Sequence, residues 1–254
     1  MRMDREKLAE ILDRGIERGR TITLKTYYLS DYGEMVLHMV TSRILARYDR
    51  SDLNDVVYTA AKELIINATK ANLKRLLFAR RGLSPDKEED YDEILHELKH
   101  ELTETRVRSY RPQFIEYNYP VLATFYYTPE VLNIKVKNSF TLYPQEEKRI
   151  RQKFEKAESF SSLLDFYLEH GDDTEGAGLG LTMVGILLDQ SGIDRHSFTL
   201  SSNKYNETAA KLEIPLNEEY IPRRQVFDTE VRQRGLSPDE LRRQYKPPLK
   251  SESQ

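Results

Sequence analysis

The stretch from Ser51 to Arg81 contains neither glycine nor proline, and it constrains the fold of this chain more than any other feature. Because these two residues are the strongest helix breakers, the stretch predicts one long helix. Ser51 suits its start, where a side-chain oxygen can accept from an unpaired backbone N–H, and Gly82 suits its end. Apolar residues recur at helical spacing and predict a core-facing side: Leu53, Val57, Ala60, Ala61, Leu64 and Ala68.

A strip of polar residues runs beside that apolar face. Glu63, Asn67 and Lys70 stand at i, i+4 and i+7, so one side of the helix carries a carboxylate, a carboxamide oxygen and an ammonium group. A magnesium-bound polyphosphate needs such a set: a hard oxygen ligand, a cation, and an acid that orients the attacking group. The simpler interpretation is a solvated edge of an amphipathic helix.

The composition limits the class of protein. A chain of 254 residues can form one packed domain with additions, and 39% hydrophobic with 32% charged residues predicts an ordinary core with charged insertions. A net charge of −3 argues against a nucleic-acid binder. The absence of cysteine excludes disulfides and thiolate metal sites. Without a hydrophobic run long enough for a membrane span, we expect a cytoplasmic protein.

Periodicity and turn signals predict the remaining elements. Asp31 with Glu34 forms a candidate capping box, and Ser84 with Pro85 a candidate helix start. Beyond residue 217 the chain is polar, and we expect an extended or partly disordered tail with one short helix at Ser237. The expected helices span 3–18, 31–47, 51–81, a segment after 84, 146–157, 161–168 and 181–191, and the expected strands span 21–28, 114–119, 121–127, 132–137, 198–202 and 209–216.

Three glycines stand where the helix near 181–191 begins. Gly176, Gly178 and Gly180 would let backbone N–H groups approach a phosphate closely, aided by the helix N-terminus. Glycines in a flexible loop without any ligand are the alternative. A dinucleotide-binding fold would place a hydrophobic strand directly before them, and this chain has an acidic loop there.

Glu63-Leu-Ile-Ile-Asn67-Ala-Thr-Lys70 resembles the Asn-box of the GHKL superfamily, and its form is closest to that of the sensor histidine kinases. The glycines at 176–180 are similar to the second glycine box of the same ATP-binding domains. The resemblance implies that Asn67 ligates magnesium, that Lys70 contacts phosphate and that Glu63 polarises the attacking group or water. It also implies that Gly176, Gly178 and Gly180 hold the phosphates.

The same resemblance assigns the nucleobase contacts. Thr208 matches a threonine near the adenine, and Asn138 stands where the family has an aspartate that accepts from the adenine amino group. An asparagine oxygen can accept the same hydrogen bond without the help of a charge. The glycines that follow the aspartate in the family are missing after Asn138.

The resemblance implies a two-layer α/β sandwich of the Bergerat type with a mixed, mainly antiparallel sheet. We expect an ATP-binding domain over 51–217, with a charged helical insertion at 82–110 and a lid at 139–175. Residues 1–50 would pack on that core, and 218–254 would form a polar tail.

The implied function is that of a histidine-kinase-like signalling kinase or ATPase that uses ATP and Mg²⁺ and acts on a partner protein. Two alternatives stay open: a regulatory module that binds ATP without turnover, and an anti-sigma-type serine kinase. We expect no nucleic-acid partner and no membrane span, and a homodimer is left open.

Two histidine features suggest other chemistry. The sequence His96-Glu-Leu-Lys-His100 fits the zinc-peptidase pattern, but charged neighbours favour a solvated helix over a buried metal site. His38 lies upstream of the Asn-box without a neighbouring acid that could activate it. We therefore predict a structural role for His38 and a phosphoryl acceptor elsewhere.

Overall fold

The computed structural model describes residues 3–158 and 180–244, and it contains a five-stranded sheet of order β1-β2-β3-β5-β4. Every pairing between neighbouring strands is antiparallel. This agrees with the expected mainly antiparallel sheet in an α/β fold. The strands are β1 (Ile22–Thr26), β2 (Val121–Tyr127), β3 (Val131–Asn138), β4 (Phe198–Asn203) and β5 (Glu207–Pro215).

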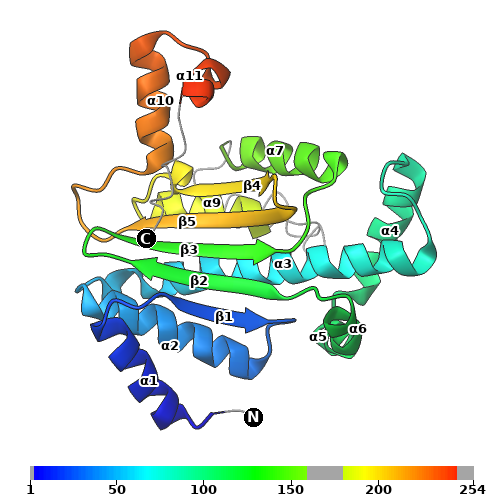
Figure 1. The fold of residues 1–254 in the computed structure, drawn as a ribbon, viewed down its shortest axis with the longest axis horizontal. Coiled ribbons are helices and arrows are strands. Elements are labelled where there is room, and N and C mark those ends of the chain that lie inside the picture. The colour runs from blue at the N-terminus through cyan, green and yellow to red at the C-terminus, as the bar shows by residue number, and fades with distance from the viewer. Residues whose placement is uncertain (1–2, 159–179, 245–254) are drawn as a thin grey trace, which may run out of the picture.

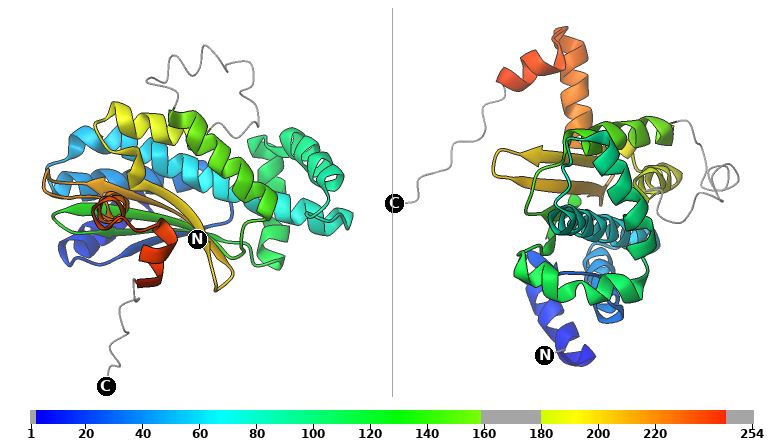
Figure 2. Two further views of the ribbon diagram at one scale, coloured as in Figure 1. Left: turned by 90° about the horizontal axis from the view of Figure 1, so that it is seen from above. Right: turned by 90° about the vertical axis from the view of Figure 1, so that its right-hand side faces the viewer.

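Helices cover one face of this sheet. Figure 1 shows α2, α3 and α9 behind the strands, and Figure 2 shows the two layers from above and from the side. The helices are α1 (Arg5–Glu17), α2 (Asp31–Arg47), α3 (Asn54–Arg81), α4 (Glu88–Glu101), α5 (Glu104–Ser109), α6 (Arg111–Glu116), α7 (Pro144–Glu158), α9 (Gly180–Gln190), α10 (Arg223–Arg234) and α11 (Pro238–Gln244), with 3-10 turns η1 (Ser51–Leu53) and η3 (Arg195–Ser197). Within 3–158 and 180–244, none of them is long and apolar enough to cross a membrane.

The long helix predicted from the sequence is α3, but it begins at Asn54 and not at Ser51. Ser51–Leu53 form the 3-10 turn η1, and no side chain caps the start of α3. It ends where Gly82 adopts a left-handed conformation, with φ of 65°, and donates its N–H to the carbonyl of Phe78. A side chain would disfavour that conformation, which explains the glycine.

Two hydrophobic clusters meet along α3. Its first half packs with α1, α2, α9 and the sheet, so residues from the first fifty share the main core. Its second half, from Leu73 to Phe78, packs with Tyr91, Ile94 and Phe114 of the segment that follows Gly82. The inserted segment therefore has an apolar anchor of its own on the far end of α3.

The strand expected at 114–119 was a wrong prediction, because these residues begin inside helix α6 and continue into a turn. Pro112 stands in the first turn of that helix, a position that tolerates proline. Phe114 is fully buried, whereas Ile115 and Tyr117 are 42% and 43% exposed. The apolar pattern therefore reflects one anchored aromatic residue and not the alternation of a strand.

Two helix starts also differ from expectation. Ser30, and not Asp31, caps α2, since its side chain accepts from the N–H of Gly33. The helix expected at Ser84 begins later, at Glu88, after a turn.

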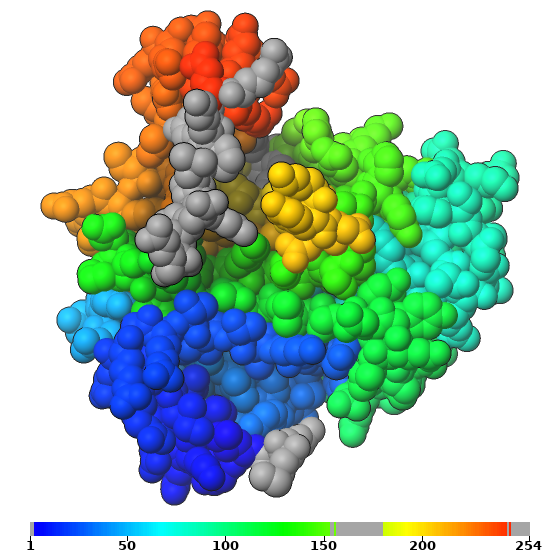
Figure 3. All heavy atoms as spheres, viewed as in Figure 1, coloured from blue at the N-terminus to red at the C-terminus, as the bar shows by residue number. Residues whose placement is uncertain are grey.

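The described part of the expected tail, 218–244, is largely helical. Helix α11 confirms the short helix expected at Ser237, whereas α10 was not expected. Helices α10 and α11 form a hairpin that stands off from the body of the molecule in Figure 3, where it is orange and red. Polar composition concealed α10, which buries none of its residues. The expected helix at 161–168 lies outside the described residues, as does the part of the expected lid from 159 to 175.

Candidate functional site

A cavity of about 530 Å³ lies between the middle of α3, helix α4, the first half of α7, the end of strand β3 and the start of strand β5. Asn67, Lys70, Asn138 and Thr208 all line it. Four residues that the sequence analysis selected from three distant segments therefore meet in one place. The sandwich brings them together because α3 packs across the strands that carry Asn138 and Thr208.

Asn138 and Thr208 face each other across neighbouring strands at the end of the sheet. The Asn138 side-chain nitrogen donates to the carbonyl of Ala68, at 2.9 Å, and to Oδ1 of Asn72, at 2.7 Å. Both bonds orient the amide group. In the part of the chain that the structure describes, its Oδ1 has no partner, so it is available as an acceptor.

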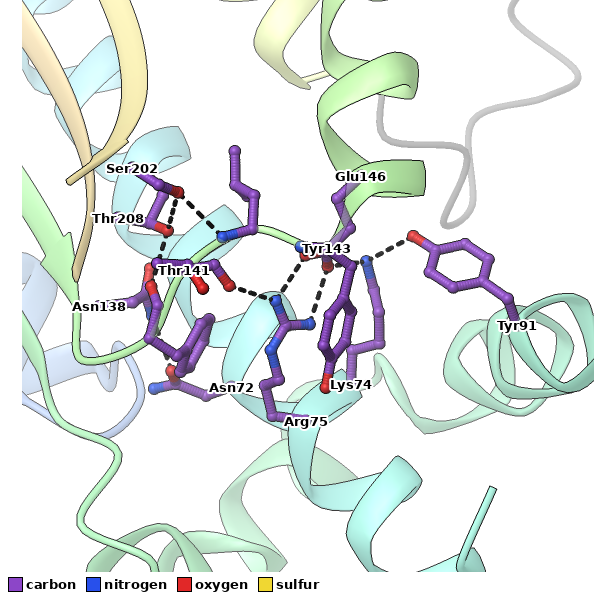
Figure 4. Close-up of polar contacts among 12 residues, drawn as sticks. Asn72, Lys74, Arg75, Tyr91, Asn138, Thr141, Tyr143, Glu146, Ser202 and Thr208 are labelled. Atoms are coloured by element: carbon purple, nitrogen blue, oxygen red, sulfur yellow. Dashed lines mark hydrogen bonds and ion pairs between the residues drawn. The ribbon is translucent and has the colours of Figure 1, made fainter. Parts of the chain in front are cut away.

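Thr208 belongs to a chain of hydrogen bonds that fixes the segment after β3. The N–H of Leu142 donates to the hydroxyl of Ser202, which lies 3.0 Å from the Thr208 hydroxyl. The Thr208 hydroxyl then donates to the carbonyl of Phe140 at 2.7 Å. Figure 4 shows how these bonds tie the end of β3 to the β4–β5 hairpin.

Glu63 and Asn67 lie one helical turn apart on α3 and are bonded, with the Asn67 amide nitrogen 3.0 Å from Glu63 Oε1. The first residue of α9 packs directly on this pair. A Cβ atom at Gly180 would lie 1.6 Å from Glu63 Oε1, so only glycine fits beside this conformation of Glu63. Neither Glu63 nor Gly180 is among the described residues that line the cavity.

Gly176 and Gly178, the other glycines expected to hold phosphates, lie outside the described residues.

A buried ion cluster beside the same cavity was not predicted from the sequence: Lys74 and Glu146 line the cavity, and Arg75 pairs with Glu146. Glu146, at the start of α7, is 5% exposed and accepts from Lys74 at 2.7 Å and from Arg75 at 2.6 and 3.1 Å. Arg75 also donates to the carbonyl of Thr141 at 2.8 Å (Figure 4). Lys74 continues the strip of Asn67 and Lys70 by one more turn of α3, and this spacing was the available signal.

The charge state of Glu146 follows from its surroundings. Burial raises the pKa of its carboxyl group, but the charges and hydrogen bonds of Lys74 and Arg75 outweigh burial and lower the pKa to about 2. The guanidinium of Arg75 lies 3.4 Å from the ring centre of Tyr143 and 4.5 Å from that of Phe140. Arg75 therefore combines stacking with ion pairing.

Helix α4 forms another wall of the cavity. His96 and Lys99 line it, and Asp92 forms an ion pair with Arg149 of α7 at 3.1 Å. The ring centres of His96 and His100 are 4.9 Å apart. Within 3–158 and 180–244, no group of three or more His, Cys, Asp or Glu side chains could hold a metal ion.

His38 lies on α2, where its Nε2 is 3.4 Å from the amide nitrogen of Asn54. Its ring packs edge-on against Tyr58, with 5.3 Å between the ring centres. His38 is exposed and meets α3 through these two contacts, and its structural role stays a prediction.

Comparison with known proteins gives one relative of undefined function. The chain is 29% identical over 210 residues to an uncharacterized protein of Treponema pallidum (strain Nichols), an alignment that covers 83% of this chain and 40% of that protein. The chain thus spans about two-fifths of the length of the relative it matches. No protein-family model matches the chain. No solved structure matches it either.

Proposed function

We propose that this chain is an ATP- and magnesium-binding protein of the histidine-kinase type, with a Bergerat-type arrangement of helices and sheet, and that it acts on a partner protein in signalling. The observation that carries the proposal is the meeting of Asn67, Lys70, Asn138 and Thr208 in a single cavity. The sequence motifs assign these residues to magnesium, phosphate and adenine.

The adenine end of the cavity would be formed by Asn138 and Thr208. The Asn138 nitrogen is committed to Ala68 and Asn72, which directs its oxygen to serve as the acceptor that a nucleobase amino group requires. Because this acceptor is neutral, we expect a weaker bond than a carboxylate would give.

The phosphate end would be formed by Asn67 and Lys70. The Asn67 nitrogen is bonded to Glu63, so its Oδ1 is the atom left to serve as a metal ligand. A single amide oxygen fits Mg²⁺, which keeps several waters and takes further ligands from substrate phosphates. Lys70 forms no ion pair with any residue that the structure describes, so its charge is available for a phosphate.

Calorimetry with ATP, with and without magnesium, tests the assignment of Asn67. We expect the wild type to bind ATP in a magnesium-dependent manner and Asn67→Ala to lose that dependence. Asn133→Ala is the matched control, because Asn133 lies on β3 and does not line the cavity. Magnesium-dependent binding that survives in Asn67→Ala would reject the assignment.

A specific observation supports the regulatory module as a second candidate. Glu63, the residue expected to polarise the attacking group, is bonded to Asn67 and packed beneath Gly180. A carboxylate held in this way is poorly placed to meet a substrate, which favours binding without turnover. Phosphate release by the wild type that disappears in Glu63→Gln would establish an ATPase. ATP binding without release or protein labelling would establish the module.

A further inference from the structure

We infer that helix α4, which belongs to the segment inserted after α3, is a second wall of the nucleotide site, and that its Lys99, assisted by His96, binds the phosphates together with Lys70. This inference rests on the proposed function, and it extends the site beyond the residues that the sequence motifs identify.

One side of α4 is buried against α3, and this packing supports the inference. Tyr91, Ile94 and Leu98 are buried in the cluster formed with the second half of α3, which fixes the helix in place. The adjacent face, with Leu95, His96, Lys99 and Leu102, lines the cavity. Because one face of α4 is packed and the adjacent face borders the cavity, the helix is positioned to contact a ligand there.

Cationic side chains outnumber carboxylates among the described residues that line the cavity. Among the described residues, its lining includes the cationic side chains of Lys70, Lys74, Lys99 and Arg149 and the carboxylates of Asp92 and Glu146. Both carboxylates are already paired, Glu146 with Lys74 and Asp92 with Arg149.

Lys70 and Lys99 are left without an ion pair among residues 3–158 and 180–244. Two unpaired ammonium groups in one cavity attract a polyanion, because attraction between opposite charges is least screened where the ligand is partly enclosed. His96 stands one turn before Lys99 on the same face of α4 and can donate a ring N–H to a phosphate oxygen. The ligand class that fits this wall is a nucleoside triphosphate, whose charge exceeds that of the monophosphate.

The test compares the magnesium-dependent binding of ATP with the binding of AMP. The variants are Lys99→Gln, Lys99→Arg and His96→Gln, with Lys87→Gln as the control because Lys87 is exposed at the start of α4 and does not line the cavity. We expect Lys99→Gln to weaken ATP binding roughly fivefold, the upper range for an exposed ion pair, with less than about a twofold change for AMP. His96→Gln should weaken ATP binding by a smaller factor. Lys99→Arg keeps the positive charge and should bind ATP about as tightly as the wild type. The loss in Lys99→Gln should shrink as salt is raised.

Two outcomes separate this inference from the proposed function. A wild type that binds ATP, with the same ratio of ATP to AMP affinity in Lys99→Gln, would overturn the role of α4 and leave the nucleotide site intact. A wild type that binds neither nucleotide would overturn the proposed function, and the inference with it. An equal loss of ATP affinity in Lys87→Gln would also reject the inference, since the effect would then come from general surface charge.

Discussion

Two groups of charged side chains at or beside the cavity differ in whether the described residues offer them an ion-pair partner. Lys74 and Arg75 share the single carboxylate of Glu146 through hydrogen bonds of 2.6 to 3.1 Å, and Arg75 is additionally stacked on two aromatic rings. Lys70, one turn earlier on the same helix, and Lys99 across from it on α4, have no such partner among the described residues. We call Lys74, Arg75 and Glu146 the held group, and Lys70 and Lys99 the unpaired group.

The difference separates stability from binding. A buried charge must be paired, because its removal from water costs several kcal/mol that only a partner can offset. The held group therefore contributes to folding and connects α7 to α3. The unpaired group lies where water can still reach it, so its charge needs no internal partner and can be used for a ligand.

The largest effect is expected from Glu146→Gln, which removes the only carboxylate of the held group and leaves Lys74 and Arg75 uncompensated. We expect a loss of about 3 kcal/mol in the free energy of unfolding, measured by urea denaturation. Glu147→Gln is the control, since the ion pair of that exposed residue within the described part of the chain is with exposed Arg151, and the change should alter stability by less than about 0.5 kcal/mol. Equal effects of the two substitutions would erase the distinction between the groups.

The pH dependence of stability checks the same prediction. The folded-state pKa of Glu146, about 2, lies below its ordinary value of 4.5, so the unfolded chain takes up a proton first as pH falls. Its contribution, about 3 kcal/mol, is therefore complete above pH 4.5 and is lost as pH falls toward 2. Glu146→Gln should flatten the stability curve over this window, and a curve as steep as that of the wild type would show that Glu146 is not the titrating group.

A smaller effect tests whether Glu63 is also held by the fold. Gly180→Ala would place a methyl group against the Glu63 carboxylate, which must then rotate away, and we expect a loss of about 1 kcal/mol. In a Glu63→Ala background the same change should be neutral or stabilising, because alanine is the better helix former once the space is free. A double-mutant cycle by thermal denaturation measures this coupling, and additive effects would show that the two residues act independently.

The smallest effect on stability is expected from Lys70→Gln, within about 0.5 kcal/mol, because Lys70 has no ion pair to lose within the described part of the chain. Lys74→Gln should cost about 1 to 2 kcal/mol, since it removes a bond to a buried carboxylate. Denaturation and ATP titration of both variants sharpen the comparison: Lys70→Gln should weaken binding more than folding, and Lys74→Gln folding at least as much as binding. If Lys70→Gln affected folding more than binding, or Lys74→Gln affected binding more than folding, the division into a held and an unpaired group would be wrong.

Local signals in the sequence were sufficient for much of the fold. The absence of breakers from Ser51 to Arg81 predicted α3, and the alternation in 132–137 predicted β3. Aromatic residues misled at 114–119, because the burial of Phe114 depends on α3 and α4, which local alternation does not reveal. Helix α10 escaped notice for the opposite reason, since a helix without buried residues has no apolar period to detect.

For the site, the sequence identified candidate ligand contacts but not the residues that hold the surrounding elements in place. Asn67, Lys70, Asn138 and Thr208 were found through motifs, and the structure places them in one cavity. The bond that makes Glu146 the partner of Arg75 joins residues 71 positions apart, and no spacing rule connects them. The part played by α4 depends on how the inserted segment folds back, which follows from the packing of the second cluster and from no local pattern.

The order of the strands also bears on how the chain assembles. The paired strands β2 and β3 are connected by a tight turn at Thr128. The paired strands β1 and β2 are separated by a much longer segment, because Thr26 lies opposite Val121, about 95 residues later in the chain. Closing the longer loop costs about 3 kcal/mol more chain entropy, so the nearer hairpin has the lower barrier to formation. We therefore expect β1, which is synthesised first, to pair with β2 only after the β2–β3 hairpin has formed, so the order of synthesis is not the order in which the sheet is completed.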